Sequence, residues 1–194
     1  LMYGLPMQSL ADLDATLDEA IRLSPSRIAL FGYAHLPNMI PRQRQIDATD
    51  LPDQRLRFEQ AQLGYRRLTD AGYIPIGFDH FARADDALAA AAREGRVNRN
   101  FQGFTEDDAP VLIGLGASSI SKFPDLLVQN EKRAGHYRDL VGEGRLAAAR
   151  GVRVDPAQQR RAAHIRDILC AGGMTVDRAE MEAVRTAVAR FEHM

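Results

Sequence analysis

The stretch "RIALFGY", from Arg27 to Tyr33, decides the fold of this 194-residue sequence. Its apolar residues follow one another without alternation, which is typical of a strand covered on both faces in a parallel sheet. The segment before it, from Leu10 to Ser24, keeps the apolar spacing of a helix, and Ser9 has the residue type of an N-cap. A helix followed by a buried strand predicts an α/β fold with parallel strands.

The same pattern returns further along the chain. After a long polar loop from Ala34 to about Asp50, Pro52 opens a second expected helix, with an apolar face of Phe58, Ala61, Tyr65 and Leu68. The next expected elements are a strand over Tyr73–Asp79, a helix over Asp85–Glu94 and a buried strand over Val111–Ser121. Right-handed crossovers would bring the carboxyl ends of the strands to one rim, where ligands of such folds bind.

From Asn130 onward the pattern predicts helices alone. Asp155 is followed by proline at the first helical position, and Met181, Val184, Val188 and Phe191 mark a last amphipathic helix. We therefore predict two domains: residues 1–127, built from strand–helix units, and residues 128–194, which are helical. The opening "LMYGLP" is typical of the end of a strand, so we expect a fragment of a larger fold.

The composition excludes several classes of function. The chain has 25 Lys and Arg against 26 Asp and Glu, so its overall charge would not hold a nucleic acid or an anionic membrane. No apolar stretch approaches the roughly 18 residues that cross a bilayer, and the N-terminus lacks a signal-peptide pattern. We expect a cytoplasmic protein without nucleic-acid or membrane partners.

Cys170 is the only cysteine of the chain. It cannot form an internal disulfide, and it cannot alone supply the thiolates of a four-iron cluster. On a helix, a lone cysteine is expected to fill an apolar site. No Walker loop, zinc-site spacing or Ser-His-Asp order appears, so we name no catalytic residue and no metal ligand.

Histidines follow two of the expected strands. Asp79 and His80 could share a metal ion, or act as a general base with its orienting carboxylate. Because neighbouring residues on a strand point to opposite faces, a hydrogen-bonded pair that shapes the rim is the favoured interpretation. His35 lies in a comparable position and is expected to be structural.

Four arginines lie in or beside the expected rim segments: Arg42, Arg44, Arg83 and Arg99. Guanidinium groups bind carboxylates in a bidentate fork, so the four would suit a substrate with several carboxylates. The alternative is that arginine is the general surface cation of this chain, since lysine occurs only at positions 122 and 132.

The exit of the last expected strand, "GLGASSIS", is glycine-rich. It does not match G-x-G-x-x-G, because serine stands where the third glycine belongs, and it indicates a nucleotide only weakly. The backbone could still approach a ligand closely there, with Ile120 against an adenine face.

Several phrases together resemble one family: "YGLPMQS", "FGYAHLPNMIPRQR", "GFDHFARADDALAAAAREG", "RNFQGFT", and "IGLGASSIS" followed by "QNEK". They are similar to the oxygen-independent coproporphyrinogen III oxidases, radical S-adenosylmethionine (SAM) enzymes of haem biosynthesis. The resemblance covers nearly the whole chain in one unbroken order. It implies that residues 1–127 are the later βα units of a partial radical-SAM (β/α) barrel, and that residues 128–194 begin an α-helical C-terminal domain.

The resemblance also implies a reaction and its cofactors. Two propionates of the tetrapyrrole coproporphyrinogen III would be oxidatively decarboxylated to vinyl groups by a 5′-deoxyadenosyl radical, made from SAM at a [4Fe-4S] cluster. Ala34, Gln102 and Ile120 match family positions near SAM. The family's cluster cysteines belong to sequence that is absent here, so the chain alone is expected to be inactive. The full-length protein is expected to be a monomer.

Two other interpretations stay open. The chain could be a haem- or porphyrin-binding module, like the chaperone-like relatives of these oxidases, without turnover. It could also be a remnant that folds poorly, because a partial barrel exposes strand edges that invite aggregation.

Overall fold

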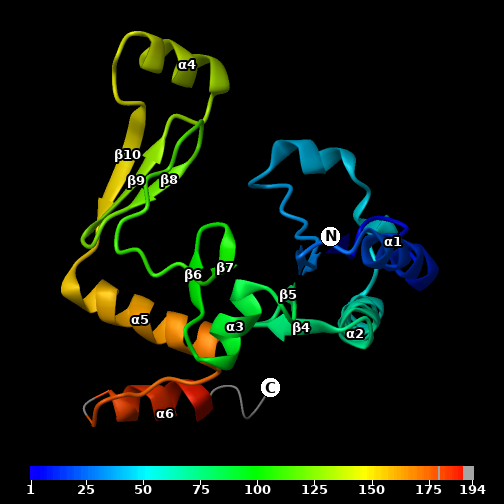
Figure 1. Cartoon of the computed structure of the whole chain (residues 1–194). Coiled ribbons are helices and arrows are strands. Elements are labelled where there is room, and N and C mark those ends of the chain that lie inside the picture. The colour runs from blue at the N-terminus through cyan, green and yellow to red at the C-terminus, as the bar shows by residue number, and fades with distance from the viewer. Residues whose placement is uncertain (179, 190–194) are drawn as a thin grey trace. The chain divides into compact units, whose positions relative to one another are not determined.

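The structure, a computed structural model, describes residues 1–178 and 180–189 (Figure 1). These residues form two compact units. Unit 1 consists of residues 1–97 and 103–106, and unit 2 consists of residues 98–102 and the described residues from 107 onward. The predicted domain division between residues 127 and 128 refers to a larger fold, and it stays a prediction.

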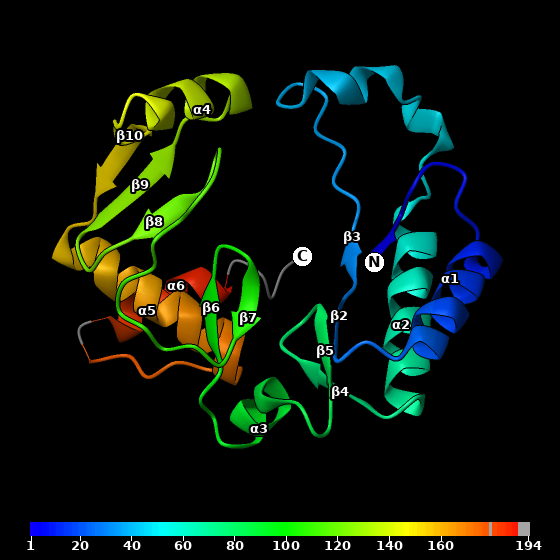
Figure 2. The ribbon, with the colours of Figure 1, turned by 45° about the horizontal axis from the view of Figure 1, so that its top comes forward.

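The strands of unit 1 pair in both parallel and antiparallel fashion. β3 (Phe31–Gly32) pairs in parallel with β1 (Met2–Tyr3). β2 (Arg27–Ala29) comes just before β3 in the chain and pairs antiparallel with β5 (His80–Arg83). β4 (Tyr73–Ile76) pairs antiparallel with the other edge of β5, as Figure 2 shows. The order β2-β5-β4 therefore places a reversed strand in the middle.

The expectation of parallel strands throughout is wrong at this point. The segment expected as one strand, Tyr73–Asp79, forms β4 and then a turn over residues 77–79, after which the chain returns as β5. Gly77 has a φ of 61°, the left-handed conformation that glycine adopts without steric cost in a tight turn. β2 and β4 still run in the same direction, because both are antiparallel to β5.

Two helices pack against these strands. α1 (Leu10–Leu23) begins at the expected N-cap, Ser9, whose hydroxyl accepts from the amide of Asp12 in a capping box. α2 (Gln54–Asp70) begins at Asp53, and Figure 2 shows it beside α1. The buried core of the unit consists of Leu13, Leu17, Ile28, Leu30, Leu68, Tyr73 and Phe81.

The face that α2 buries differs from the predicted one. Phe58 and Tyr65, expected in the core, are 63% and 51% exposed, whereas Gln60 and Gly64 are buried together with Leu68. A β-carbon on Gly64 would stand 2.1 Å from Cδ2 of the core residue Leu30, so the glycine lets the helix approach the strand. Apolar spacing alone cannot detect a face that depends on a missing side chain.

The run from β2 to β3 is not covered on both faces by the described residues. Ile28 and Leu30 are each 5% exposed, whereas Phe31 is 45% exposed. Within unit 1 only the side toward the helices is buried, so the continuous apolar run overstated the burial of this strand.

The remaining elements of unit 1 are short. The long polar loop contains two turns of 3-10 helix, η1 (Pro41–Gln45) and η2 (Ala48–Asp50). The helix expected over Asp85–Glu94 is present as α3 (Ala87–Arg93), with Asp86 as its N-cap. β7 (Gly103–Thr105) also belongs to unit 1, whereas β6 (Asn98–Asn100) belongs to unit 2.

Unit 2 is built around an antiparallel sheet in the order β10-β9-β8. Its strands are β8 (Ile120–Lys122), β9 (Leu126–Asn130) and β10 (Ala148–Arg153), and its helices are α4 (Ala134–Gly142), α5 (Pro156–Ala171) and α6 (Met181–Ala189). α4 lies in the connection between β9 and β10, at the end of the sheet in Figure 1.

Two sequence predictions for unit 2 are wrong. The segment Val111–Ser121 is not one buried strand, because Leu112 forms only an isolated bridge to Lys122 and residues 113–119 form a loop. β10 contradicts the prediction of helices alone after Asn130. All six residues of β10 are exposed, so it carries no hydrophobic alternation that would reveal a strand.

The predicted start of α5 is confirmed. Asp155 accepts from the amide of Gln158 in a capping box, and Pro156 stands at the first turn. The last predicted helix is described as α6, whereas Phe191, which was assigned to its apolar face, lies outside the described residues.

Candidate functional site

Two of the three residues expected near a cofactor line one pocket of unit 2. The pocket has a volume of about 300 Å³. Its lining comes from Phe101 and Gln102 after β6, from residues 112–115, 118 and 119, and from Ile120 at the start of β8. The backbone amide of Gln102 donates to Oδ1 of Asn100 at 2.8 Å, which fixes the turn that carries it. We call this hollow the Gln102–Ile120 pocket.

One side of the pocket is a tight loop, Gly114–Ser119, called the pocket loop below. Gly116 and Ser118 have positive φ angles of 104° and 64°. A β-carbon on Gly114 would stand 2.7 Å from the carbonyl oxygen of Ile120, so the loop returns closely onto the start of β8. The glycines therefore bring the backbone itself to the pocket.

The pocket combines apolar and hydrogen-bonding groups. Ile113 and Leu115 are 58% and 84% exposed, and both line the hollow. The side-chain amide of Gln102 can both donate and accept hydrogen bonds. This lining suits a small molecule with an apolar plane and a polar edge.

Ala34, the third expected cofactor residue, follows the carboxyl end of β3 in unit 1. Its carbonyl oxygen accepts from Nε2 of Gln43 at 3.0 Å, which pins the polar loop to the strand end. Nδ1 of His35 lies 3.3 Å from the hydroxyl of Tyr33. Ala34 belongs to unit 1 and the Gln102–Ile120 pocket to unit 2, so the expected closeness of the three residues stays a prediction.

Asp79 and His80 form a hydrogen-bonded pair at the turn between β4 and β5. Oδ1 of Asp79 and Nδ1 of His80 are 2.6 Å apart, and both side chains are 16% exposed. The histidine ring packs edge-on against Phe104, with ring centroids 5.3 Å apart. Asp79 lies in the turn rather than on a strand, so the two neighbours can face each other. The predicted hydrogen bond between the two residues is confirmed, whereas their role in shaping a rim stays a prediction.

The four candidate arginines lie in different places. Arg42 and Arg44 are exposed on η1, and Arg99 is exposed on β6 of unit 2. Arg83 is the last residue of β5, and its Nη1 donates to Oγ of Ser24 at 2.6 Å. Because β5 runs backwards, Arg83 lies at the amino ends of β2 and β4. Its expected position at the carboxyl-end rim is therefore wrong.

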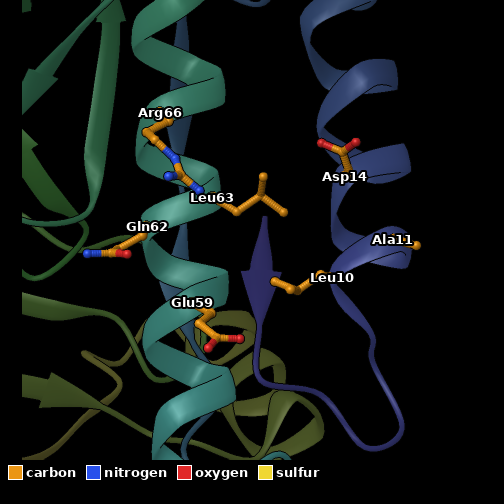
Figure 3. A pocket seen from close by; sticks show the side chains of 7 residues that line it. All are labelled: Leu10, Ala11, Asp14, Glu59, Gln62, Leu63 and Arg66. Atoms are coloured by element: carbon orange, nitrogen blue, oxygen red, sulfur yellow. The ribbon is translucent and has the colours of Figure 1, made fainter.

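A larger hollow of about 420 Å³ lies between α1 and α2. Figure 3 shows Leu10 and Leu63 reaching into it from the two helices. Its carboxylates already have partners, since Asp14 pairs with Arg67 and Glu59 pairs within α2. It contains none of the expected site residues, and we do not take it as the functional site.

The residues of this chain do not fit an iron–sulfur cluster. Such clusters are held by several cysteine thiolates, and Cys170 is the only cysteine. Burial raises the pKa of its thiol, which disfavours the thiolate that a metal needs. Among residues 1–178 and 180–189, no three potential ligands come together at one point.

Comparison with known proteins gives named relatives. The chain is 46% identical over 170 residues to the oxygen-independent coproporphyrinogen III oxidase of Cereibacter sphaeroides, a match that covers 88% of this chain and 38% of the relative. It is 42% identical over 170 residues to that of Pseudomonas aeruginosa, covering 88% of this chain and 37% of that protein. Over most of its length the chain is therefore similar to the oxygen-independent coproporphyrinogen III oxidases. No protein-family model matches it.

A solved structure shows the same likeness. The coproporphyrinogen III oxidase of Escherichia coli, described as a radical SAM enzyme, has a TM-score of 0.79 and 40% identity, covering 88% of this chain and 39% of that one. The predicted fold class is thereby confirmed, with no closed barrel among the described residues. The chain spans about 38% of the length of the oxidases that it matches. None of its described helices is long and apolar enough to span a membrane.

Sequence reasoning missed residues that support the expected oxidase site. Arg57 of α2 donates from Nη2 to the carbonyl of Tyr33 at 2.8 Å, just before Ala34. A β-carbon on Gly4 would stand 2.6 Å from Nη1 of Arg57. The glycine after the first strand could therefore have indicated that another side chain packs closely there. Tyr137, which bonds to the pocket loop, lies 21 residues from its partner and carries no local signal.

Proposed function

We propose that this chain works as part of an oxygen-independent coproporphyrinogen III oxidase. The reaction would oxidatively decarboxylate two propionates of coproporphyrinogen III to vinyl groups and give protoporphyrinogen IX in haem biosynthesis. The observation that carries the proposal is the 46% identity over 170 residues with a named oxidase. The whole enzyme would act as a cytoplasmic monomer on its tetrapyrrole substrate, without nucleic-acid or membrane partners.

The cofactor part of the proposal rests on the Gln102–Ile120 pocket. Ile120 and the exposed Leu115 would contact the apolar face of a bound SAM molecule, and the amide of Gln102 would meet a polar edge. Ala34 would contribute from the end of β3. When bound, SAM supplies the one-electron oxidising chemistry of the family. The single cysteine does not fit the cluster, so the 194 residues by themselves are proposed to be inactive.

The substrate part rests on arginine. Four propionates of the substrate call for several guanidinium groups, because each can bind a carboxylate with two parallel hydrogen bonds. Arg42 and Arg44 are exposed on η1, within the polar loop that begins at Ala34. This position supports a role in binding the propionates. Arg99 belongs to the same proposal. Arg83 does not, because it lies at the amino ends of β2 and β4 and donates to Ser24.

The test is a chimera of two oxidases. The matching 170 residues of the Cereibacter sphaeroides protein are replaced by those of this chain, because the two are 46% identical there. After reconstitution with iron and sulfide, anaerobic incubation with coproporphyrinogen III and SAM is expected to give protoporphyrinogen IX, measured by chromatography. The unaltered relative is the positive control.

Two results would overturn the proposal. One is a folded, cluster-loaded chimera that makes no product while the relative does. The other is stoichiometric and stable haem binding by the chimera without conversion of coproporphyrinogen, which would favour a porphyrin carrier.

A further inference from the structure

The pocket loop has no regular structure of its own, and yet it forms one side of the Gln102–Ile120 pocket. Gly116 and Ser118 hold backbone angles that side chains rarely adopt, and Leu115 is 84% exposed. A segment with so little burial is held in shape by hydrogen bonds rather than by packing. The residues that make these bonds control the shape of the pocket.

Asn130, the last residue of β9, makes three hydrogen bonds to this loop. Its side-chain amide donates from Nδ2 to the carbonyl oxygens of Gly114 and Gly116, both at 3.1 Å. Its backbone amide donates to the carbonyl of Ser119 at 2.9 Å. Only a side chain with two N–H donors on one atom can join two carbonyls in this way.

Tyr137 of α4 holds the same loop from another element. Its hydroxyl oxygen accepts from the backbone amide of Gly116 at 3.0 Å. Gly116 is therefore held at its carbonyl by β9 and at its amide by α4. Asn130 and Tyr137 thus hold Gly116 without lining the pocket themselves. Ser118, at the other end of the turn, is held by the side chain of Gln129 and by the backbone of Glu131.

The effect reaches the pocket through the backbone. Ile120 begins β8, and the backbone of Ile120 lies against Gly114, as the 2.7 Å distance for a β-carbon there indicates. A shift of the loop would move Leu115 and the serines of the lining relative to Ile120. Ligand contacts would weaken although no lining residue had changed.

We propose that Asn130 and Tyr137 are positioning residues that hold the pocket loop in the conformation that binds SAM. The inference rests on the proposed function, because that function names the ligand. It adds that the "QNEK" segment and α4 support the pocket loop without lining the pocket. They would affect the affinity for SAM rather than the decarboxylation itself.

Two isosteric variants of the chimera test this inference. Asn130→Asp keeps the size but removes the donors and sets a carboxylate against two carbonyl oxygens. Tyr137→Phe removes only the hydroxyl. Each is expected to raise the KM for SAM by about 5- to 30-fold, as the loss of one or two such bonds predicts. The kcat at saturating SAM and the KM for coproporphyrinogen III are expected to change less than twofold. Tyr65→Phe, an exposed tyrosine of unit 1, is the matched control.

Hydrogen exchange provides a second readout that needs no turnover. The amide of Gly116 is expected to exchange faster in Tyr137→Phe, with an unchanged melting temperature. An unchanged KM for SAM in both variants would overturn the inference, and so would an equal rise in both KM values. If the unaltered chimera makes no product, that result counts against the proposed function instead. Hydrogen exchange at the Gly116 amide would still test whether Tyr137 holds the pocket loop.

Discussion

The ring of His80 occupies the space that a β-carbon on Gly103 would need. Such an atom would stand 2.4 Å from Nε2 of the histidine. The ring cannot easily move away, because Asp79 holds its Nδ1 at 2.6 Å and Phe104 packs edge-on against it. Gly103 also has a φ of 136°, which L side chains rarely adopt. Within unit 1, Gly103 is thus joined to the "GFDHFA" segment through a contact that only glycine allows.

Replacement of Gly103 by alanine is expected to destabilise the chain. The clash with His80 and the backbone angle together should cost about 2–4 kcal/mol, the range for an overpacked contact with added strain. Urea unfolding followed by circular dichroism measures the loss. Gly95→Ala is the matched control, because Gly95 has a φ of 67° but no atom within 4 Å of a β-carbon. Equal losses in the two variants would contradict a steric contact with His80.

Gly64 should tolerate alanine poorly for a different reason. The residue is in mid-helix, where alanine is the better helix former by about 1 kcal/mol. The added methyl would meet Leu30 in the core, and overpacking of this kind costs about 1–3 kcal/mol. We expect Gly64→Ala to lower the unfolding free energy. Gly135→Ala in α4, where nothing lies within 4 Å, should leave it unchanged or raise it. A gain in stability for Gly64→Ala would contradict the packing described here.

Local signals predicted the helix starts well. Ser9 and Asp155 both cap the helices expected from them, because capping depends only on a side chain and the next few amides. Sequence patterns did not predict structure that depends on contacts between residues far apart in the chain. The buried face of α2 follows from the contact of Gly64 with Leu30, which the apolar spacing of Phe58 and Tyr65 does not reveal.

The candidate site shows the same limit. Gln102 and Ile120 share a pocket, as their family resemblance suggested. Arg83 was misplaced, because a glycine turn reverses the chain between β4 and β5 and no periodicity marks that turn. β10 was missed because its exposed residues follow no apolar pattern, and it is held by pairing with β9. Strand pairing of this kind is set by the whole sheet rather than by the strand itself.

Arg42 is expected to contribute to substrate affinity in the chimera. An exposed guanidinium that binds a propionate increases substrate affinity about tenfold. Arg42→Met should therefore raise the KM for coproporphyrinogen III by the same factor. The KM for SAM should stay within twofold. Arg55→Met is the control, because Arg55 is exposed on α2 and pairs with Glu59. Equal KM values for coproporphyrinogen III in both variants would remove Arg42 from the proposal.

Glu131 should make the stability of the chain depend on pH in the acid range. It accepts from the amide of Arg133 at 2.9 Å and lies 3.0 Å from Nδ1 of His136. These hydrogen bonds, the one from Arg133 first, lower the pKa of Glu131 from 4.5 to about 2. A carboxyl group whose pKa falls on folding adds stability above its unfolded pKa and loses it as the pH drops through the folded pKa.

The expected loss for Glu131 therefore lies between pH 4.5 and about 2. Glu131→Gln cannot titrate at this position, so the unfolding free energy of the variant should fall less steeply over this window. Urea unfolding of the chain and the variant at a series of pH values from neutral to acid measures the two slopes. Parallel slopes would mean that the hydrogen bonds to Glu131 are absent in solution. A steeper slope in the variant would reverse the sign of the linkage and contradict the geometry of this turn.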